Sequence, residues 1–445
     1  MFTAWRRWLA SSLCVLLGAL GAGCGGSSRR VSRPLGSLAN GPIASIAGGG
    51  FAGYALLANG RVWAWGDDLE GQIGTGGAWQ SSATPVEVPG LADVIAIAGG
   101  QNTAYALRLD GTVWGWGDDA QDELGDDGAS PRQIPKRIGV PSGIVAIGAG
   151  AFSAYALRRD GSVWAWGSNS FDQLGTGGSI LPSGIPRRVR RLPAIVAIAA
   201  GSGDGYALDG DGRVWAWGDD GLGQLGTGGC TASRVLTRDG SPCPLAGGPV
   251  EVKGLKGVTA IAAGADTVYA LMRDGTVWGW GDGSFGALGT RIGHAFADQP
   301  VRIGGLDHVV AIIAGTYSGY AILRDGSVWA WGRGVDGELG DGSTANRAMP
   351  TRVLALTGVI RLAGGGTTAY ALDRRGQVWA WGSGLYGQLG NGYILVGVDE
   401  PVRVRKLSQA TPKSDHNRPE EPAEWREGAL GSTPARSPGA GRAVG

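Results

Sequence analysis

Residues that commonly carry catalysis or bind metals are scarce in this chain of 445 residues, which contains 3 histidines and 4 cysteines. It shows no nucleophile motif and no zinc-ligand spacing, so we expect a protein that is not an enzyme. An excess of basic charge is also missing, because 39 Lys and Arg residues face 38 Asp and Glu residues. A near-neutral chain lacks the basic surface typical of nucleic-acid-binding proteins, and we expect no nucleic-acid partner.

Long apolar segments are missing as well. The apolar run at residues 9–20 is too short to cross a bilayer comfortably, and it follows the basic pair Arg6 and Arg7. Small residues then lead directly to Cys24, and glycine follows it. This arrangement resembles a bacterial lipoprotein signal, which implies that Cys24 is lipidated and held at the outer membrane or cell surface. The alternative is an ordinary secretory signal that is cleaved nearby, and either signal predicts export.

Repetition is the main positive feature of the sequence. Trp-x-Trp-Gly occurs seven times at intervals of about 50 residues, with one longer interval of about 63 residues, and a fixed period of this size indicates a repeat architecture. A tyrosine precedes each copy in constant register. The tryptophans that begin the copies are Trp63, Trp114, Trp164, Trp215, Trp278, Trp329 and Trp379.

Each repeat unit contains four segments with strand-like composition. In the third unit, residues 155–157 and 163–166 flank Asp160-Gly161, a pair typical of a hairpin turn. A small-residue segment at 144–149 precedes this hairpin. A segment beginning at Pro186 follows it, and proline favours an outer strand. Helical periodicity is missing, which argues against a solenoid. We therefore predict an all-β, seven-bladed β-propeller of four-stranded blades.

The repeats resemble those of the regulator of chromosome condensation family over about residues 42–405. The shared pattern is a small-residue strand, an Ala-Leu strand, Asp-Gly, an aromatic-x-Trp-Gly strand and Gly-Gln-Leu-Gly. The last element appears here at 223–226 and 387–390, and as Gly-Gln-Ile-Gly at 71–74. The family usually has a histidine in the second strand. This chain instead has Ala52, Thr103, Ser153, Asp204, Thr267, Ser318 and Thr368 at that position.

The resemblance carries two different functional implications. One is a binding scaffold, because a secreted bacterial relative inhibits a β-lactamase by binding it through a propeller face. The other is guanine-nucleotide exchange on a small GTPase, the best-known activity of the family. We expect the first, with an envelope or extracellular protein as partner and a monomeric propeller. The candidate contact surface comprises Trp79, Phe171, the insertion at 230–247 and the acidic residues that follow Trp-Gly strands.

Those acidic residues include Asp68, Asp119 and Asp220, which the repeat should gather on one face of the propeller. They suit two roles. They are either a carboxylate rim that binds a cation or a basic partner, or acceptors for nearby backbone N–H groups in Asx turns. A hydrolase with an acidic pair in a cleft is a further alternative.

The insertion in the fourth unit contains Cys230 and Cys243. In an oxidising compartment we expect them to form a disulfide, whereas a metal pair or two free thiols are the alternatives.

No cofactor is expected. The Gly-x-Gly-x-x-Gly matches at 281–286, 332–337 and 382–387 occur in repeat register without the βαβ unit of a dinucleotide site. Asp209-Gly-Asp-Gly212 coincides with a hairpin turn and lacks the other ligands of a calcium loop.

The predicted organisation therefore has four parts: a lipoprotein-type signal peptide at 1–24, a flexible tether at 25–41, the propeller at 42–407 and a disordered tail at 408–445. Closure of the ring has two solutions. Residues 401–404 pair with the first blade, or each unit is already one complete blade.

Overall fold

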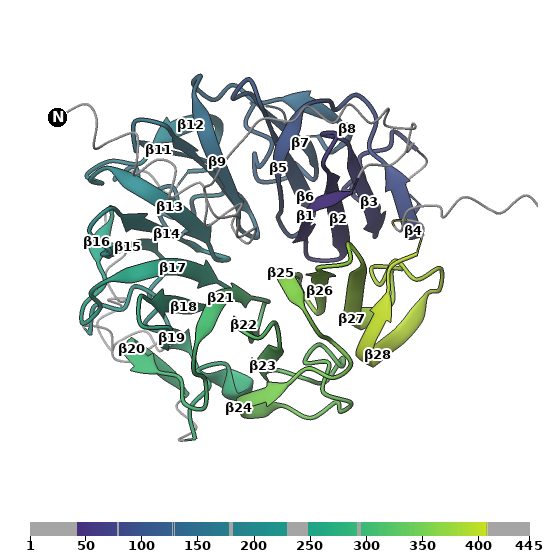
Figure 1. The fold of residues 1–445 in the computed structure, drawn as a ribbon. Helices are drawn as coiled ribbons and strands as arrows, with labels where there is room; N and C mark the ends of the chain where they lie inside the picture. The colour runs from purple at the N-terminus through teal and green to yellow at the C-terminus, as the bar shows by residue number, and fades with distance from the viewer. Residues whose placement is uncertain are drawn as a thin grey trace, which may run out of the picture. The chain divides into compact units, whose positions relative to one another are not determined.

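The computed structural model describes residues 42–77, 80–126, 128, 130–177, 181–228, 248–291, 295–405 and 407. Seven antiparallel sheets, each of four strands, surround a central axis (Figure 1). In the described part of the chain the one helical element is η1 (Ser284–Gly286), a single 3-10 turn. The prediction of a seven-bladed, all-β propeller is confirmed. Among the described residues there is also no helix with the length and hydropathy needed to cross a membrane.

The blades follow one another along the chain, each with its strands in sequence order. The first four blades contain β1 (Ile43–Gly48), β2 (Ala52–Leu57), β3 (Val62–Gly66), β4 (Ser82–Glu87), β5 (Val94–Gly99), β6 (Thr103–Arg108), β7 (Val113–Gly117), β8 (Arg132–Arg137), β9 (Ile144–Ala149), β10 (Ser153–Arg158), β11 (Val163–Gly167), β12 (Ser183–Arg188), β13 (Ile195–Ala200), β14 (Asp204–Asp209), β15 (Val214–Gly218) and β16 (Val250–Glu251). The last three contain β17 (Val258–Ala263), β18 (Thr267–Met272), β19 (Val277–Asp282), β20 (Phe296–Arg302), β21 (Val309–Ala314), β22 (Ser318–Leu323), β23 (Val328–Gly332), β24 (Arg347–Arg352), β25 (Val359–Gly364), β26 (Thr368–Asp373), β27 (Val378–Gly384) and β28 (Leu395–Arg403).

The hairpin between the second and third strands of a blade is a local structure. In the third blade Leu157 pairs with Val163, and the turn between them closes through Gly161, whose N–H donates to the carbonyl of Arg158 at 2.9 Å. Gly161 has a φ of 83°, a left-handed value that glycine adopts without steric cost. The Asp-Gly turn signal in the sequence is therefore explained by the backbone itself.

Small residues occupy the inner strands because neighbouring blades nearly touch at the axis. A Cβ atom on Gly48 would lie 2.5 Å from the carbonyl oxygen of Gly364, which belongs to the last blade. The proline-containing strand β12 pairs with β11 alone, at the other edge of its sheet. The predicted placement of proline strands on an outer edge is thus confirmed for this blade, where their missing N–H groups cost no ladder bond.

One polar node recurs at each junction between blades. The second tryptophan of every Trp-x-Trp-Gly copy is buried and donates its Nε1–H to a backbone carbonyl of the preceding blade, at 2.7–2.9 Å. The repeat tyrosine of that preceding blade donates its hydroxyl to the same carbonyl, at 2.6–3.2 Å. The constant register of tyrosine and tryptophan in the sequence follows from this shared acceptor. The acceptors are the carbonyls of Gln72, Glu123, Gln173, Gln224, Ala287, Glu338 and Gln388.

The seventh and first blades meet through the same tryptophan–tyrosine hydrogen-bond node, and the two blades exchange no strand. Strand β28 pairs with β27 inside the seventh blade, so each sequence unit is one complete blade. Trp65 of the first blade donates to the carbonyl of Gln388 at 2.9 Å and packs edge-on against Tyr370, with ring centroids 5.8 Å apart. Of the two solutions for closure, the structure has the one in which 401–404 stays in its own blade.

Candidate binding face

The loops at one end of the propeller are rich in acidic residues, which are buried or half-buried. This end carries the loop between the first and second strands of each blade and the loop between the third and fourth strands, since consecutive strands are antiparallel. We call it the acidic face, and the end with the hairpin turns the hairpin face. Two short segments of each blade, residues 49–51 and 67–73 in the first blade and their equivalents in the others, line this end, and Arg333 is their one basic residue. Their acidic residues are Asp67, Asp68, Glu70, Asp118, Asp119, Asp122, Glu123, Asp172, Asp219, Asp220, Asp266, Asp282, Asp336 and Glu338.

Asp68, Asp119 and Asp220, predicted as part of a contact surface, are buried beneath this face. Their exposed fractions are 3%, 0% and 7%. Each accepts the backbone N–H of the residue five positions later, at 2.8–2.9 Å. Asn169 occupies the same repeat position in the third blade and accepts the N–H of Leu174 in the same way. These carboxylates therefore shape the loops, as the Asx-turn alternative describes.

Burial governs the ionisation of these carboxyl groups. It raises the pKa of Asp68, Asp119 and Asp220 to about 6 in each case, against the opposing effect of the N–H donor. Burial likewise raises the pKa of Glu123 to about 7. The loops of the acidic face thus contain carboxyl groups that change charge just below neutral pH.

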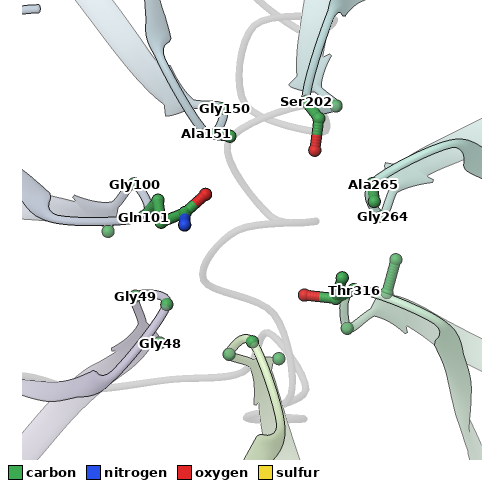
Figure 2. A pocket seen from close by; sticks show the side chains of 18 of the residues that line it. Gly48, Gly49, Gly100, Gln101, Gly150, Ala151, Ser202, Gly264, Ala265 and Thr316 are labelled. Atoms are coloured by element: carbon green, nitrogen blue, oxygen red, sulfur yellow. The ribbon is translucent and has the colours of Figure 1, made fainter. Parts of the chain in front are cut away.

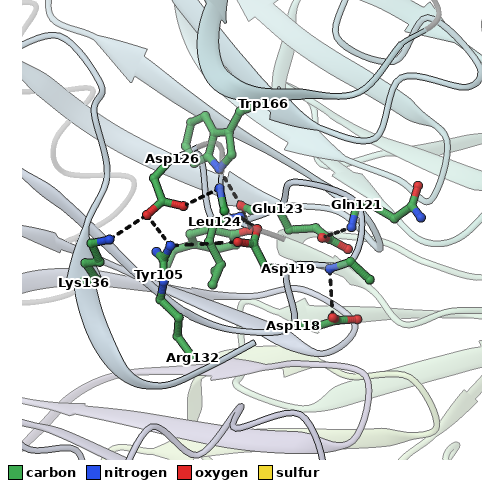
Figure 3. A network of polar contacts seen from close by, with 12 residues as sticks. Tyr105, Asp118, Asp119, Gln121, Glu123, Leu124, Asp126, Arg132, Lys136 and Trp166 are labelled. Atoms are coloured by element: carbon green, nitrogen blue, oxygen red, sulfur yellow. Dashed lines mark hydrogen bonds and ion pairs between the residues drawn. The ribbon is translucent and has the colours of Figure 1, made fainter. Parts of the chain in front are cut away.

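The second blade shows how such a loop is held together (Figure 3). The Glu123 side chain accepts the N–H of Gln121 at 2.7 Å. The backbone carbonyl of Glu123 accepts hydrogen bonds from the Tyr105 hydroxyl and the Trp166 Nε1–H. Arg132 lies 3.9 Å from Asp119 and forms an ion pair with Asp126, which Lys136 also approaches at 2.9 Å. These contacts fix the loop, and among the described residues only Asp119 Oδ2 and Arg132 Nη1 of this network lack a hydrogen-bond partner.

A cavity of about 510 Å³ opens on the axis of the acidic face. Its wall is the inner loops of all seven blades, mostly glycine and alanine, and side chains of Gln101, Ser202 and Thr316 point toward the axis (Figure 2). Backbone bonds tie neighbouring loops together, such as Ser202 N–H to Ala265 O at 3.0 Å and Ala265 N–H to Thr316 O at 3.0 Å. The rim is therefore a rigid, largely backbone-lined opening.

A second cavity of about 400 Å³, which we call the side cavity, lies beside the axial one and shares Ser202 and Asp266 with it. Phe171, predicted from the sequence as a contact residue, lines it and is 40% exposed. Phe152 of the same blade also lines it and is 39% exposed. Asp219 and Asp266 supply its carboxylates. The structure thus brings Phe171 together with Asp219, one of the acidic residues that follow Trp-Gly strands, and with Phe152 and Asp266, which were not predicted from the sequence.

Two further aromatic pairs bridge neighbouring blades on this face. Phe51 contacts Tyr386 with ring centroids 5.3 Å apart, and Phe285 contacts Tyr317 at 5.6 Å. Phe285 and Tyr386 occupy the same loop position as Phe171, directly before the first residue of the turn that ends in Leu-Gly; that residue is Gly286, Gly387 and Asp172 respectively. This shared position in the repeat is the sequence signal by which Phe285 and Tyr386 could have been predicted as contact residues. They remain 46% and 37% exposed.

Several predicted site residues cannot be placed. Trp79, Cys24, Cys230, Cys243 and the whole insertion at 230–247 lie outside the described residues. Within the described part of the chain, no group of three or more His, Cys, Asp or Glu residues could hold a metal ion. The candidate site is therefore the acidic face with its axial and side cavities.

A seven-bladed propeller with a tryptophan–tyrosine node at each junction defines the class of protein, and comparison with known proteins identifies the family. The chain matches the RCC1-like domain over residues 14–290 and the regulator of chromosome condensation (RCC1) repeat over 274–322, 325–372 and 375–414. The chain belongs to this family. The resemblance found in its repeats is confirmed.

The similar proteins named here are eukaryotic. The chain is 31% identical over 338 residues to E3 ubiquitin-protein ligase HERC2 of Homo sapiens, covering 72% of this chain and 7% of that protein. It is 27% identical to Protein pim1 of Schizosaccharomyces pombe, covering 65% of this chain and 46% of pim1. The chain thus spans less than half the length of either relative. The solved structure of Prp20p from Saccharomyces cerevisiae superposes with a TM-score of 0.69 at 25% identity, over 79% of this chain and 87% of that one, and is described with binding properties to Gsp1p and histones.

Proposed function

We propose that this protein is an exported, membrane-tethered propeller that binds a protein partner through its acidic face. The observation that carries the proposal is the set of aromatic side chains on this face, Phe152, Phe171, Phe285 and Tyr386, which are 37–46% exposed on loops fixed by buried nodes. Exposed aromatic residues on a rigid frame are typical of protein interfaces, because they bury much area at little entropic cost. The binding of Gsp1p and histones by Prp20p supports protein recognition as the role of such a propeller.

The proposed location depends on the N-terminal segment. Lipidation of Cys24 in a bacterial envelope would tether the propeller through residues 25–41 and place the partner in the envelope or outside the cell. Inhibition of the partner is one form that binding would take. Metabolic labelling with a lipid precursor tests the anchor: we expect label in the wild type and none in Cys24→Ala, whereas a cytoplasmic, unlabelled protein would contradict it.

Capture of envelope proteins tests the binding face. The chain is immobilised as wild type, as the double variant Phe285→Ala/Tyr386→Ala, and as Leu109→Ala, a control whose side chain is 73% exposed on the hairpin face. We expect the double variant alone to lose the captured partner, with melting temperatures unchanged. Equal capture by all three proteins would contradict the acidic face as the interface.

Two alternatives remain open to direct tests. Nucleotide exchange would be detected as accelerated release of a labelled guanine nucleotide from a small GTPase. A hydrolase would need an acidic pair in a cleft, and Asp219 with Asp266 in the side cavity is where the described residues offer one. Loss of a hydrolytic activity in Asp219→Asn would favour that alternative over a scaffold.

A further inference from the structure

The side cavity presents hydrogen-bond acceptors from four consecutive blades and no basic residue in its lining. The third blade contributes Ser168, Ser170 and Gln173, the fourth Ser202 and Asp219, and the fifth Asp266; Gln121 of the second blade completes its polar wall. Hydroxyl, amide and carboxylate oxygens thus converge on a space of about 400 Å³. Such a lining suits a ligand that is rich in donors and positively charged.

Aromatic rings form the apolar part of the same cavity. Phe171 reaches over the fourth blade, since a Cβ atom on Gly203 would lie 3.1 Å from its Cδ2. Glycine at 203 therefore leaves the space that the ring occupies. Phe152 and Phe171 keep 39% and 40% of their surface exposed, so both rings remain accessible from the solvent. The π-face of an aromatic ring attracts cations, and arginine more often than lysine.

Three aspartates lie in or directly beside this cavity. Asp219 is positioned by the N–H of Gly221, which its Oδ1 accepts at 2.9 Å, and Asp266 accepts Nε2–H of Gln224 at 3.4 Å. Asp204 follows directly after the lining residues Ser202 and Gly203 and is 1% exposed. Its Oδ2 accepts the hydroxyl of Tyr206, but its Oδ1 has no hydrogen-bond partner among the described residues.

The three carboxyl groups of the cavity region act on one another. Burial raises the pKa of Asp204 well above its usual value, and the nearby Asp266 and Asp219 raise it further. This coupling means that the carboxyl groups are close enough to repel when ionised. A cation in the cavity would relieve that repulsion, and the described lining contains none of its own.

We propose that the side cavity binds the guanidinium group of an arginine on the partner protein. The planar guanidinium offers five donors in fixed directions, which suits acceptors on several sides, and it stacks on aromatic rings. An ammonium group offers three donors from a point charge and satisfies fewer of these acceptors. The inference rests on the proposed function, because it names the chemistry by which the acidic face recognises a protein.

The surroundings favour a basic segment as the source of this arginine. The loops around both cavities are acidic, with Arg333 as the one basic residue in the segments compared above, and Arg333 pairs with Asp336 and Glu338 at 2.6 Å each. Because the side cavity shares Ser202 and Asp266 with the axial cavity, a chain that crosses the face can contact both. A complementary field of this kind also speeds association at low salt.

Binding of short peptides to the full chain tests the proposal. The probes are acetyl-Gly-Arg-Gly-amide, its lysine counterpart and its glutamine counterpart, titrated by calorimetry at low and high salt. We expect the arginine peptide to bind more tightly than the lysine peptide, the glutamine peptide not to bind, and high salt to weaken the complex.

Two pairs of matched variants locate the site. Asp219→Asn is compared with Asp118→Asn, the same loop position in the second blade, where Oδ1 accepts the N–H of Ala120 at 3.0 Å. Phe171→Ala is compared with Leu109→Ala, whose side chain is 73% exposed on the hairpin face. Asparagine keeps one acceptor oxygen for the turn, so each variant loses the negative charge and one acceptor oxygen of the side chain. We expect roughly tenfold weaker binding for Asp219→Asn, a several-fold loss for Phe171→Ala, and no change in either control.

The outcomes separate this inference from the proposed function. Absence of peptide binding, or equal losses in the test and control variants, would overturn the guanidinium site. If Asp219→Asn and Phe171→Ala then still captured the envelope partner, the scaffold role would stand without it. Peptide binding that depends on Asp219 and Phe171 would establish the site even if no envelope partner were captured, and only the scaffold role would fail.

Discussion

The two faces of the propeller use aspartate for the same task in opposite electrostatic settings. On the hairpin face Asp110 is exposed and accepts the N–H and hydroxyl of Thr112 at 2.9 and 2.6 Å. On the acidic face Asp68 is 3% exposed and accepts the N–H of Ile73 at 2.9 Å. The hydrogen bonds to Thr112 lower the pKa of Asp110, whereas burial raises the pKa of Asp68 to about 6.

This difference shows that burial, more than hydrogen bonding, decides the sign of the shift. A donated N–H stabilises the ionised carboxylate in both loops. For Asp68, however, the free-energy cost of removing the carboxylate from water exceeds the stabilisation that the hydrogen bond provides. The hairpin turn is a local structure of a few residues. The loop of the acidic face is enclosed by neighbouring blades, and tryptophans from those blades hold it in place.

The largest expected effect comes from removing such a tryptophan. Trp166→Ala should lower the free energy of unfolding by about 3–5 kcal/mol, because it deletes a fully buried ring and leaves a cavity. It also removes the Nε1–H donor to the carbonyl of Glu123. Denaturant unfolding measures the loss, and amide hydrogen exchange should accelerate in the loop at 118–126 more than in the hairpin at 109–112.

The control is the other tryptophan of the same pair. Trp164 is half-buried, and its Nε1 has no hydrogen-bond partner among the described residues. Trp164→Ala should therefore cost less stability and leave exchange in the loop at 118–126 unchanged. Equal losses in the two variants would show that the inter-blade node is not what holds the acidic face.

An intermediate effect is expected from Asp68→Asn. The raised pKa means that the folded state binds a proton more tightly than the unfolded chain, so Asp68 lowers stability progressively as pH rises from about 4 to about 6. Asparagine keeps the acceptor, as Asn169 does in the third blade. The variant should be more stable at pH 7 by up to about 3 kcal/mol and lose this part of the pH dependence. Urea unfolding at several pH values measures it, and a profile identical to wild type would refute the buried-carboxyl explanation.

The smallest effect, with the opposite sign, is expected from Asp110→Asn on the hairpin face. The lowered pKa means that Asp110 contributes stability above the pKa of the unfolded chain, which is lost as pH falls through the folded-state pKa. Removing its charge should slightly lower the melting temperature at pH 7 and have no effect under acidic conditions. A stabilised variant at pH 7 would remove the contrast between the two faces.

Much of the fold could be predicted because its signals are local and repeated. Asp160-Gly161 specifies a hairpin turn through the positive φ of glycine, and Trp-x-Trp-Gly marks the strand that follows. The seven copies of the repeat unit predicted the number of blades. The predicted aspartate cluster did gather on one face, since equivalent residues of equivalent blades must do so.

The candidate site was less predictable because it depends on residues from different units. Phe171 was selected from the sequence, but its neighbours Gly203 and Asp266 lie in the next two blades. Burial of Asp68 and Asp119 was equally hidden, because the alternation of a strand says nothing about a loop covered by its neighbours. Each of these features requires the spatial order of the blades.

The amino-acid sequence by itself determined the hairpins, the blade count and the register of tyrosine and tryptophan, because short-range sterics and a strict repeat specify them. Only the tertiary structure decided how the ring closes, with Trp65 bonded to the carbonyl of Gln388, 323 residues away. It also decided which carboxyl groups are buried and which reach the side cavity. The physical reason is that solvation and charge coupling depend on neighbours in space, and in a propeller these neighbours come from separate blades.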